Sequence, residues 1–125
     1  MKVQQYKKVE GKEYTGKAEG VKVRWLITKD DGAPNFTMRV IEMAKGGGQT
    51  DFDVHPWEHE VFVIKGEGVV MDEHGNQKKL RPGDFVYVAP NEKHMFKSTG
   101  DSPLEFVCLI PNDAGKQKGS GGTSC

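Results

Sequence analysis

The chain has 125 residues, and its 18 lysines and arginines balance its 18 aspartates and glutamates. This length fits one domain that buries roughly two-thirds of its unfolded surface. The zero net charge leaves no basic excess for a phosphate backbone, and no apolar stretch reaches the ~18 residues of a transmembrane span, so we expect neither nucleic acid nor membrane as a partner.

Short β-rich runs separated by turn residues fill the chain. No window of a dozen residues carries apolar positions at helical spacing without a glycine or proline break, and glycine reaches 16 of 125 residues. Many short strands with glycine and proline corners predict an all-β sandwich or barrel. The expected strands are 21–28, 36–43, 60–66, 68–73, 77–80, 84–90, 94–98 and 104–110.

The domain boundaries follow from composition. We assign 1–112 to a single domain with an N-terminal extension over about residues 1–20, whose leading strand can join the sheet edge of a second copy. Residues 113–125 lack apolar content and are expected to form a disordered tail.

Two histidines and an aspartate lie around one corner of the chain, and a third histidine begins a later strand. Asp53 and His55 have the i, i+2 spacing that places two side chains on one face of a strand. Pro56 interrupts that strand, so His59 opens the next one and can face back toward them. His94 opens a later strand. Asp53, His55 and His59 are each within reach of one ion at the ~2.0–2.2 Å typical of nitrogen and carboxylate ligands, and His94 is the candidate for the distant fourth ligand that a site built from barrel strands needs.

An ordinary explanation stands beside the metal site. A single histidine near an apolar strand is usually a partly buried polar side chain, and histidines also gather by chance at strand edges. His74, at the hairpin tip DEHGNQ, illustrates that case and receives no role. Spacing alone leaves both explanations open.

Two stretches resemble the two signatures of the cupin superfamily. GGGQTDFDVHPWEHEVFVIKGEG holds a glycine, a ligand-x-His pair, a further ligand and a second glycine. GNQKKLRPGDFVYVAPNEKHMFKS holds Pro82-Gly83-Asp84, then Pro90, then His94. The flanking runs are similar to those of small single-domain bacterial cupins whose metal, often manganese, is held by four histidines.

The resemblance implies a cupin-type antiparallel jelly-roll β-barrel with one divalent transition metal per chain inside its mouth. By position it implies His55, His59 and His94 as ligands. His59 stands where most cupins carry glutamate, which is a trait of the four-histidine subgroup. Asp53 departs from the pattern, because it stands where that subgroup has a histidine. Cupins commonly form two-fold dimers, so we expect a homodimer.

Asp53 leaves three interpretations open. As a ligand, it gives a three-histidine, one-carboxylate site, which we favour because a cation stabilises a buried anion. Otherwise its short side chain orients His55 or a bound water, or it marks loss of metal binding. Carboxylate suits manganese and iron while imidazole suits iron, nickel, copper and zinc, so we expect manganese or iron, with nickel, copper and zinc as alternatives.

The run LEFVCLI predicts part of a substrate pocket. If Glu105 faces solvent, alternation sends Phe106, Cys108 and Ile110 inward, where they line an apolar cavity or simply pack in the core. Arg39 either reaches this pocket and binds a carboxylate or peroxide anion, or is exposed. Such a lining suits a small apolar or aromatic substrate.

These features favour a metal-dependent enzyme. The sequence contains no further catalytic motif, so no catalytic residue beyond the metal ligands is identified. Our leading hypothesis is an oxygenase acting on an unsaturated or aromatic small molecule. The alternatives are a redox-neutral isomerase or lyase, and a non-catalytic module that binds a metal or small molecule. The start of the chain lacks a signal-peptide core and its two cysteines form no disulfide framework, so we expect a cytoplasmic protein.

Overall fold

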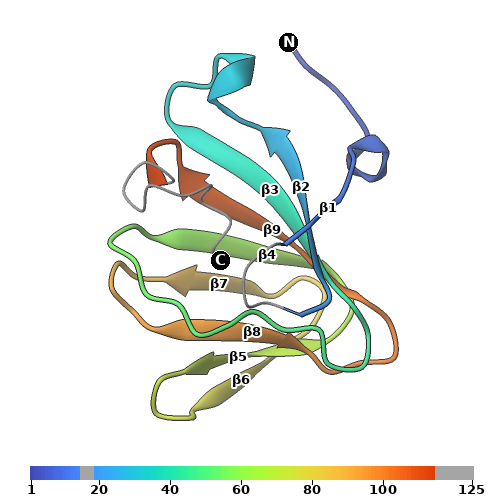
Figure 1. Ribbon diagram of the computed structural model, residues 1–125, viewed down its shortest axis with the longest axis vertical. Helices are drawn as coiled ribbons and strands as arrows, with labels where there is room; N and C mark the ends of the chain where they lie inside the picture. Colours follow the sequence, from blue (N-terminus) through green and yellow to red (C-terminus); the bar gives the residue numbers. More distant parts are fainter. Residues whose placement is uncertain (15–18, 115–125) are drawn as a thin grey trace.

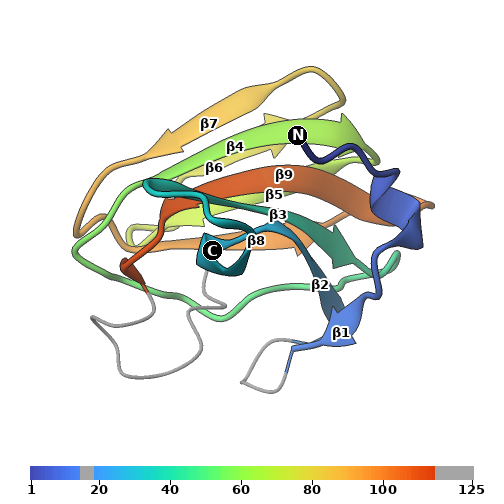
Figure 2. The same cartoon turned by 90° about the horizontal axis from the view of Figure 1, so that it is seen from above.

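The computed structural model describes residues 1–14 and 19–114, and within them the chain forms two antiparallel sheets that face each other (Figures 1 and 2). The larger sheet has the order β1-β2-β3-β9-β4-β7 and the smaller one the order β6-β5-β8. The strands are β1 (Lys12–Glu13), β2 (Val21–Ile27), β3 (Phe36–Met43), β4 (His59–Lys65), β5 (Gly68–Asp72), β6 (Gln77–Leu80), β7 (Phe85–Val88), β8 (His94–Ser98) and β9 (Leu104–Pro111), with single-turn 3₁₀ helices η1 (Tyr6–Lys8) and η2 (Lys29–Asp31). This arrangement confirms the predicted all-β jelly roll in a single domain.

The expected strands are all present, with ends that shift by one or two residues. The segment 51–58 differs, because the strand predicted through Asp53 and His55 is irregular. Only Asp53 pairs there, in an isolated bridge to His94. Pro56 explains the difference in part, since it has no N–H to donate to a neighbouring strand. Among the described residues, no helix is long and apolar enough to cross a membrane.

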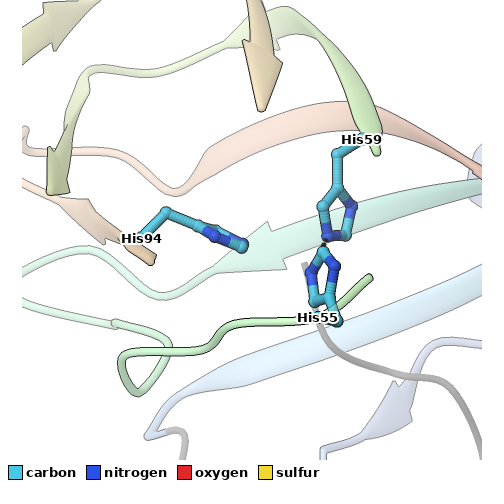
Figure 3. Close-up of side chains that lie close together, drawn as sticks. All are labelled: His55, His59 and His94. Atoms are coloured by element: carbon cyan, nitrogen blue, oxygen red, sulfur yellow. Dashed lines mark hydrogen bonds between the residues drawn. The ribbon is translucent and has the colours of Figure 1, made fainter. Parts of the chain in front are cut away.

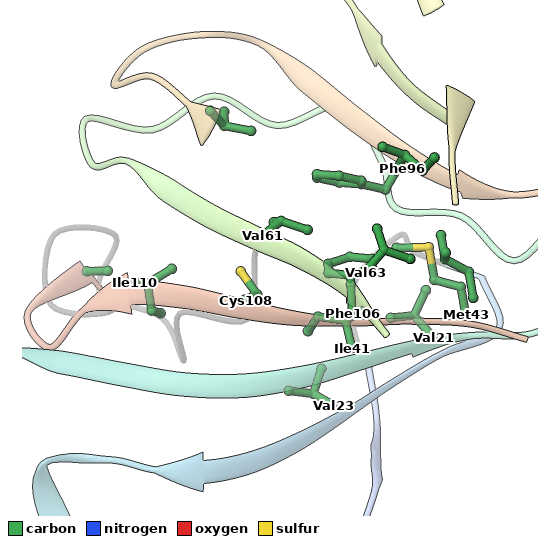
Figure 4. Packing of buried hydrophobic residues seen from close by; sticks show 14 of the residues in the cluster. Val21, Val23, Ile41, Met43, Val61, Val63, Phe96, Phe106, Cys108 and Ile110 are labelled. Atoms are coloured by element: carbon green, nitrogen blue, oxygen red, sulfur yellow. The ribbon is translucent and has the colours of Figure 1, made fainter. Parts of the chain in front are cut away.

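The hydrophobic core lies between the two sheets (Figure 4). From β9, Phe106, Cys108 and Ile110 point inward and are at most 4% exposed, which confirms the predicted alternation. Phe106 packs against Phe96 of β8 with ring centroids 5.0 Å apart, so the two sheets meet through aromatic contact. The core therefore fills the barrel below the histidine-bearing ends of β4 and β8.

The N-terminal segment covers part of the outer face of the larger sheet. Glu105, predicted to face solvent, is instead only 3% exposed, because the Tyr6 hydroxyl donates to its carboxylate at 2.9 Å and the Lys7 ammonium at 3.0 Å. β1 pairs with β2 of its own chain rather than standing free. Of the expected tail at 113–125, residues 115–125 lie outside the described residues.

We expect Lys7→Met to destabilise the fold by about 0.5–1 kcal/mol, since it leaves a buried carboxylate with one donor fewer while the lysine itself is half-exposed and screened. The hydrogen bond to Glu105 raises the pKa of Lys7 above its usual 10.5. The stabilisation is therefore complete below that value and disappears as pH rises through the folded-state pKa. Urea unfolding measures the change, and Lys8→Met, at an exposed neighbour, is the matched control.

Candidate metal centre

Three buried histidines meet at the mouth of the barrel (Figure 3). His59 opens β4, His94 opens β8, and His55 projects from the segment between β3 and β4; each is at most 2% exposed. One ring nitrogen from each lies within 4.8 Å of the others. The structure thus brings together the three histidines that the sequence singled out.

Backbone hydrogen bonds hold the two ligand-bearing segments side by side. Asp53 and His94 exchange both of their N–H···O bonds, at 2.9 and 3.0 Å. The Asn91 N–H donates to the His55 carbonyl at 2.7 Å, and Asn91 adopts the left-handed conformation (φ 65°) that asparagine tolerates. These bonds fix His55 relative to His94 although the two residues are far apart in sequence.

Main-chain carbonyls set the tautomers of two rings. The Nδ1 atom of His55 lies 2.8 Å from the Trp57 carbonyl oxygen, and that of His94 lies 2.7 Å from the Glu92 carbonyl oxygen. A carbonyl oxygen only accepts, so each Nδ1 carries the proton and each neutral ring presents an unprotonated Nε2. This is the arrangement that orients histidine ligands around a metal ion.

The tautomer of the third ring, that of His59, is set by a sulfur atom. Cys108 is disulfide-bonded, so its sulfur has no proton to donate and accepts from His59 Nδ1 at 3.2 Å and from Arg39 at 3.1 Å. The Nε2 atoms of His59 and His55 are 2.5 Å apart, where two lone pairs repel unless a cation or proton lies between them. His94 Nε2 is buried and makes no hydrogen bond in the described structure. The site therefore fits a cation held by three imidazoles.

Asp53 lies next to this cluster. It stands directly opposite His94 across the isolated bridge, so both side chains project from the same face of the pair. Its Oδ1 accepts the Val54 N–H at 2.9 Å. Among the described residues, the group whose ligand atoms converge consists of the three histidines, and ligation by Asp53 stays a prediction.

Arg39 is the largest fully buried side chain of the described residues. It points into the barrel from β3, with its guanidinium carbon 5.4 Å from the centroid of the Trp25 ring. The alternative prediction, that Arg39 is exposed, is therefore wrong. Burial lowers the pKa of Arg39 to about 10, well below the usual range of arginine but still above neutral pH. The positive charge of Arg39 therefore lies near His59, because both side chains contact the sulfur of Cys108.

The remaining pocket residues lie in the core. Phe106, Cys108 and Ile110 belong to the hydrophobic cluster, and their role in binding a substrate stays a prediction. The sequence predicted no disulfide framework; Cys108 is disulfide-bonded, and Cys125 lies outside the described residues.

Two contributors to the site escaped the sequence analysis. Trp57 is 4% exposed and stacks on His55 with centroids 4.4 Å apart, and its carbonyl and that of Glu92 orient the rings. The carbonyl contacts come from the main chain, so the identities of these residues carried no signal for them.

A groove leads toward the cluster from the side of the barrel. It has a volume of about 590 Å³ and runs between β6 and β7, which are edge strands of the two sheets. His94 lies at one end, and Tyr87, Lys78 and Lys93 are among the residues that line it. The groove provides a route by which a small molecule can approach His94.

An antiparallel jelly roll with a three-histidine cluster at its mouth defines a class of small metal-binding β-barrels. The family model of the cupin domain matches residues 39–110, which is more than half of the chain, so this protein belongs to the cupin family. The cupin resemblance read from the sequence is thereby confirmed, and the cluster indicates a bound metal ion whose identity is open.

The chain is similar to proteins of several kinds. The chain is 33% identical over 100 residues to a glucose-6-phosphate isomerase of Thermococcus onnurineus, covering 72% of this chain and 53% of that protein. It is 31% identical over 65 residues to an oxalate-binding protein of Thermotoga maritima, covering 51% of this chain and 53% of that one. The chain spans about half the length of these curated relatives. The polyketide cyclase RemF from Streptomyces resistomycificus superposes with a TM-score of 0.84 at 25% identity, covering 90% of this chain and 80% of that one.

Proposed function

We propose that this cupin is a metal-dependent enzyme that isomerises or cyclises a small carbonyl compound without net oxidation. The observation that carries the proposal is the convergence of three buried imidazoles whose rings are oriented by carbonyls and a sulfur. A divalent ion on three neutral ligands keeps its full charge and, when bound, supplies Lewis acidity to a carbonyl oxygen.

The names of the relatives support a redox-neutral reaction. An isomerase and a polyketide cyclase both rearrange a carbonyl compound without adding oxygen, and both resemble this chain in sequence or fold. The oxygenase that we first favoured uses the same centre but has no counterpart among the relatives described above. The oxygenase is the second candidate function, and manganese or iron as the bound metal stays a prediction.

The chain's own residues have distinct tasks in this proposal. His55, His59 and His94 hold the ion, and burial of their rings keeps competing water away from the coordinating nitrogens. Arg39 carries its charge on the inner face of the barrel beside the sulfur that contacts His59, where it favours a substrate with a carboxylate or another anionic oxygen. The groove itself carries balanced formal charge, with Lys78, Lys79 and Lys93 against Asp72, Asp84 and Glu92.

The test separates the reaction classes by product mass. Purified chain loaded separately with manganese, iron or zinc is incubated with aldose and ketose phosphates, linear polyketide mimics and oxo acids, and the products are weighed by mass spectrometry. We expect products of unchanged mass, or lighter by one water, at equal rates with and without air. Products that gain oxygen, with matching oxygen uptake, would establish the oxygenase instead. Tight binding without turnover, as with oxalate, would favour a binding module.

A further inference from the structure

The groove between β6 and β7 continues well past the metal centre. Its volume of about 590 Å³ lies within the ~300–1,000 Å³ of pockets that bury drug-sized ligands. His94 lies at one end, and the turn at 81–84, which joins β6 to β7, contributes Gly83 and Asp84 at the other. The groove is therefore open space that begins beside a metal-binding histidine and leads away from it.

The inner face of the smaller sheet forms one wall of the groove. Residues paired directly across neighbouring strands share a face, so Val70 and Lys78 lie on the same face as the core residue Phe96, with which they form one row. The next row toward the mouth pairs Asp72 with His94. Because such rows are two residues apart along a strand, the row of Val70 lies ~6.6–6.8 Å from the row of His94.

Strand β7 forms the opposite wall. Val86 pairs with the core residue Val61, and Val88 pairs with His59, so both valines face the interior. Packed sheets lie ~10 Å apart, and long side chains normally fill that space. Here the short side chains of Val70 and Val86 line the groove, pack against the core and remain partly exposed, so space is left between the sheets.

The carboxylates of the groove are held by turns of the chain itself. Each of the three accepts a main-chain N–H from its own turn, Asp72 at 2.9 Å, Asp84 at 2.8 Å and Glu92 at 3.1 Å. The hydrogen bond from Asn76 also lowers the pKa of Asp72 below its usual value, so this group stays ionised at neutral pH. The carboxylates are therefore fixed anions at the rim, and the valines provide the apolar surface between the walls.

This combination selects the kind of molecule that the groove can hold. Among the described residues that line it, three lysines balance the three carboxylates, so a phosphate or sulfonate gains no excess of positive charge there. The valine walls favour burial of apolar groups, while the charged rim tolerates scattered polar substituents. Size and chemistry both indicate an elongated and largely apolar ligand without net charge.

We propose that the groove binds the remote, non-reacting part of an elongated and largely apolar carbonyl substrate, whose reacting carbonyl lies at the metal centre. The inference rests on the proposed function, because it takes the three histidines as the place of the reaction. Contacts of the remote part with Val70 and Val86 supply binding energy that positions the carbonyl.

The test measures binding by calorimetric titration of the zinc-loaded chain. Three diketones share one chelating head and differ in their tail: acetylacetone, benzoylacetone and the biphenyl analogue of benzoylacetone. We expect the affinity to rise about 10-fold with each added ring, since each ring removes apolar surface from water. A sulfonate at the far end of the biphenyl tail should add nothing, because the groove carries no net charge. Zinc content, measured before and after titration, verifies that the probes do not extract the ion.

Two variants fill the groove with a side chain of the protein. In Val86→Trp and in Val70→Phe, the preference for the biphenyl probe over acetylacetone should fall from about 100-fold to near equality. Val107→Trp is the matched control, because Val107 is also partly exposed but lies outside this groove, and it should keep the wild-type preference. Circular dichroism and zinc content verify folding. In the wild-type chain, the methyl resonances of Val70 and Val86 should shift with the biphenyl probe and not with acetylacetone.

Three results would overturn the proposal. They are wild-type affinities that do not rise with the tail, a rise that both groove variants retain, and tighter binding of the sulfonate-bearing tail than of the neutral one. Turnover is measured separately. A chain that binds the long probes but converts no carbonyl compound contradicts the proposed function and not the groove, whereas conversion of short carbonyl compounds without any gain from a tail contradicts the groove alone.

Discussion

Replacing His55, His59 or His94 by alanine will leave a folded chain that no longer retains metal. Each replacement removes one of three nitrogens that converge within 4.8 Å. Loss of a residue that merely orients a ligand lowers metal affinity by about 10–100-fold, so loss of a ligand should exceed about 100-fold. Elemental analysis after dialysis should find close to one divalent ion per wild-type chain and almost none in the variants.

The control for these variants is His74→Ala. His74 is exposed in the β5–β6 turn and lies outside the cluster, so its loss should leave metal content unchanged. Thermal unfolding gives a second readout, because an ion that binds only the folded chain raises the melting temperature. A chelator should lower the melting temperature of wild type and of His74→Ala, but not that of the three ligand variants. Wild-type metal content in any ligand variant would contradict the three-histidine centre.

The same measurements decide whether Asp53 is a metal ligand like the three histidines. If it ligates, Asp53→Ala will lower metal content, whereas Asp53→His, which restores the residue that the four-histidine subgroup carries, will retain it. If Asp53 only lies beside His94, both variants will load like wild type, since the bridge between the two residues is formed by the main chain.

The strands and the ligands could be read from the sequence because both depend on local pattern. Alternation predicts which residues of β9 face the core, and the spacing of His55 and His59 around Pro56 places two imidazoles at one corner. His94 is distant in sequence, and the resemblance of its segment to the second cupin signature placed it with them. Arg39 was not predictable in this way. Its strand β3 carries apolar residues on both faces, so the polarity of its sequence shows no clean alternation.

Part of the outer face of the larger sheet is buried by a segment that is distant in sequence. The carbonyl of Val9 accepts from Arg24 at 3.3 Å, while Tyr6 and Lys7 donate to Glu105, so the N-terminal segment lies over the sheet beside β3. Contacts between residues about 100 positions apart leave no trace in local periodicity. The same reason explains why Glu105 was expected to face solvent and is buried.

Replacing Arg39 by methionine will make the protein more stable while metal content stays unchanged. Burial lowers the pKa of Arg39 to about 10, well below its usual value, which corresponds to a cost of about 3 kcal/mol for keeping the side chain charged below pH 10. Methionine fills a similar volume without that charge. The substitution also removes the contacts of Arg39 to Cys108 and Trp25, and this loss offsets about 1–2 kcal/mol of the gain in stability.

The expected net gain is therefore about 1–2 kcal/mol, or a melting temperature higher by about 4–8 °C. Because the penalty comes from the charged form, it is fully present at neutral pH and declines only as pH rises through about 10. The stability difference between wild type and Arg39→Met should shrink at alkaline pH. Arg81→Met, at an exposed turn, is the control and should change stability little at any pH.

The same variant tests why a charge is kept in the barrel at such a cost. If Arg39 serves the substrate, metal-loaded Arg39→Met will be more stable than wild type yet will bind oxalate about 10–100-fold more weakly, as loss of a charge-assisted hydrogen bond predicts. Calorimetric titration measures this, and a neutral diol of similar size should show no such loss. A variant that is less stable than wild type, or that binds oxalate equally well, would show that Arg39 is a structural side chain whose contacts outweigh its burial.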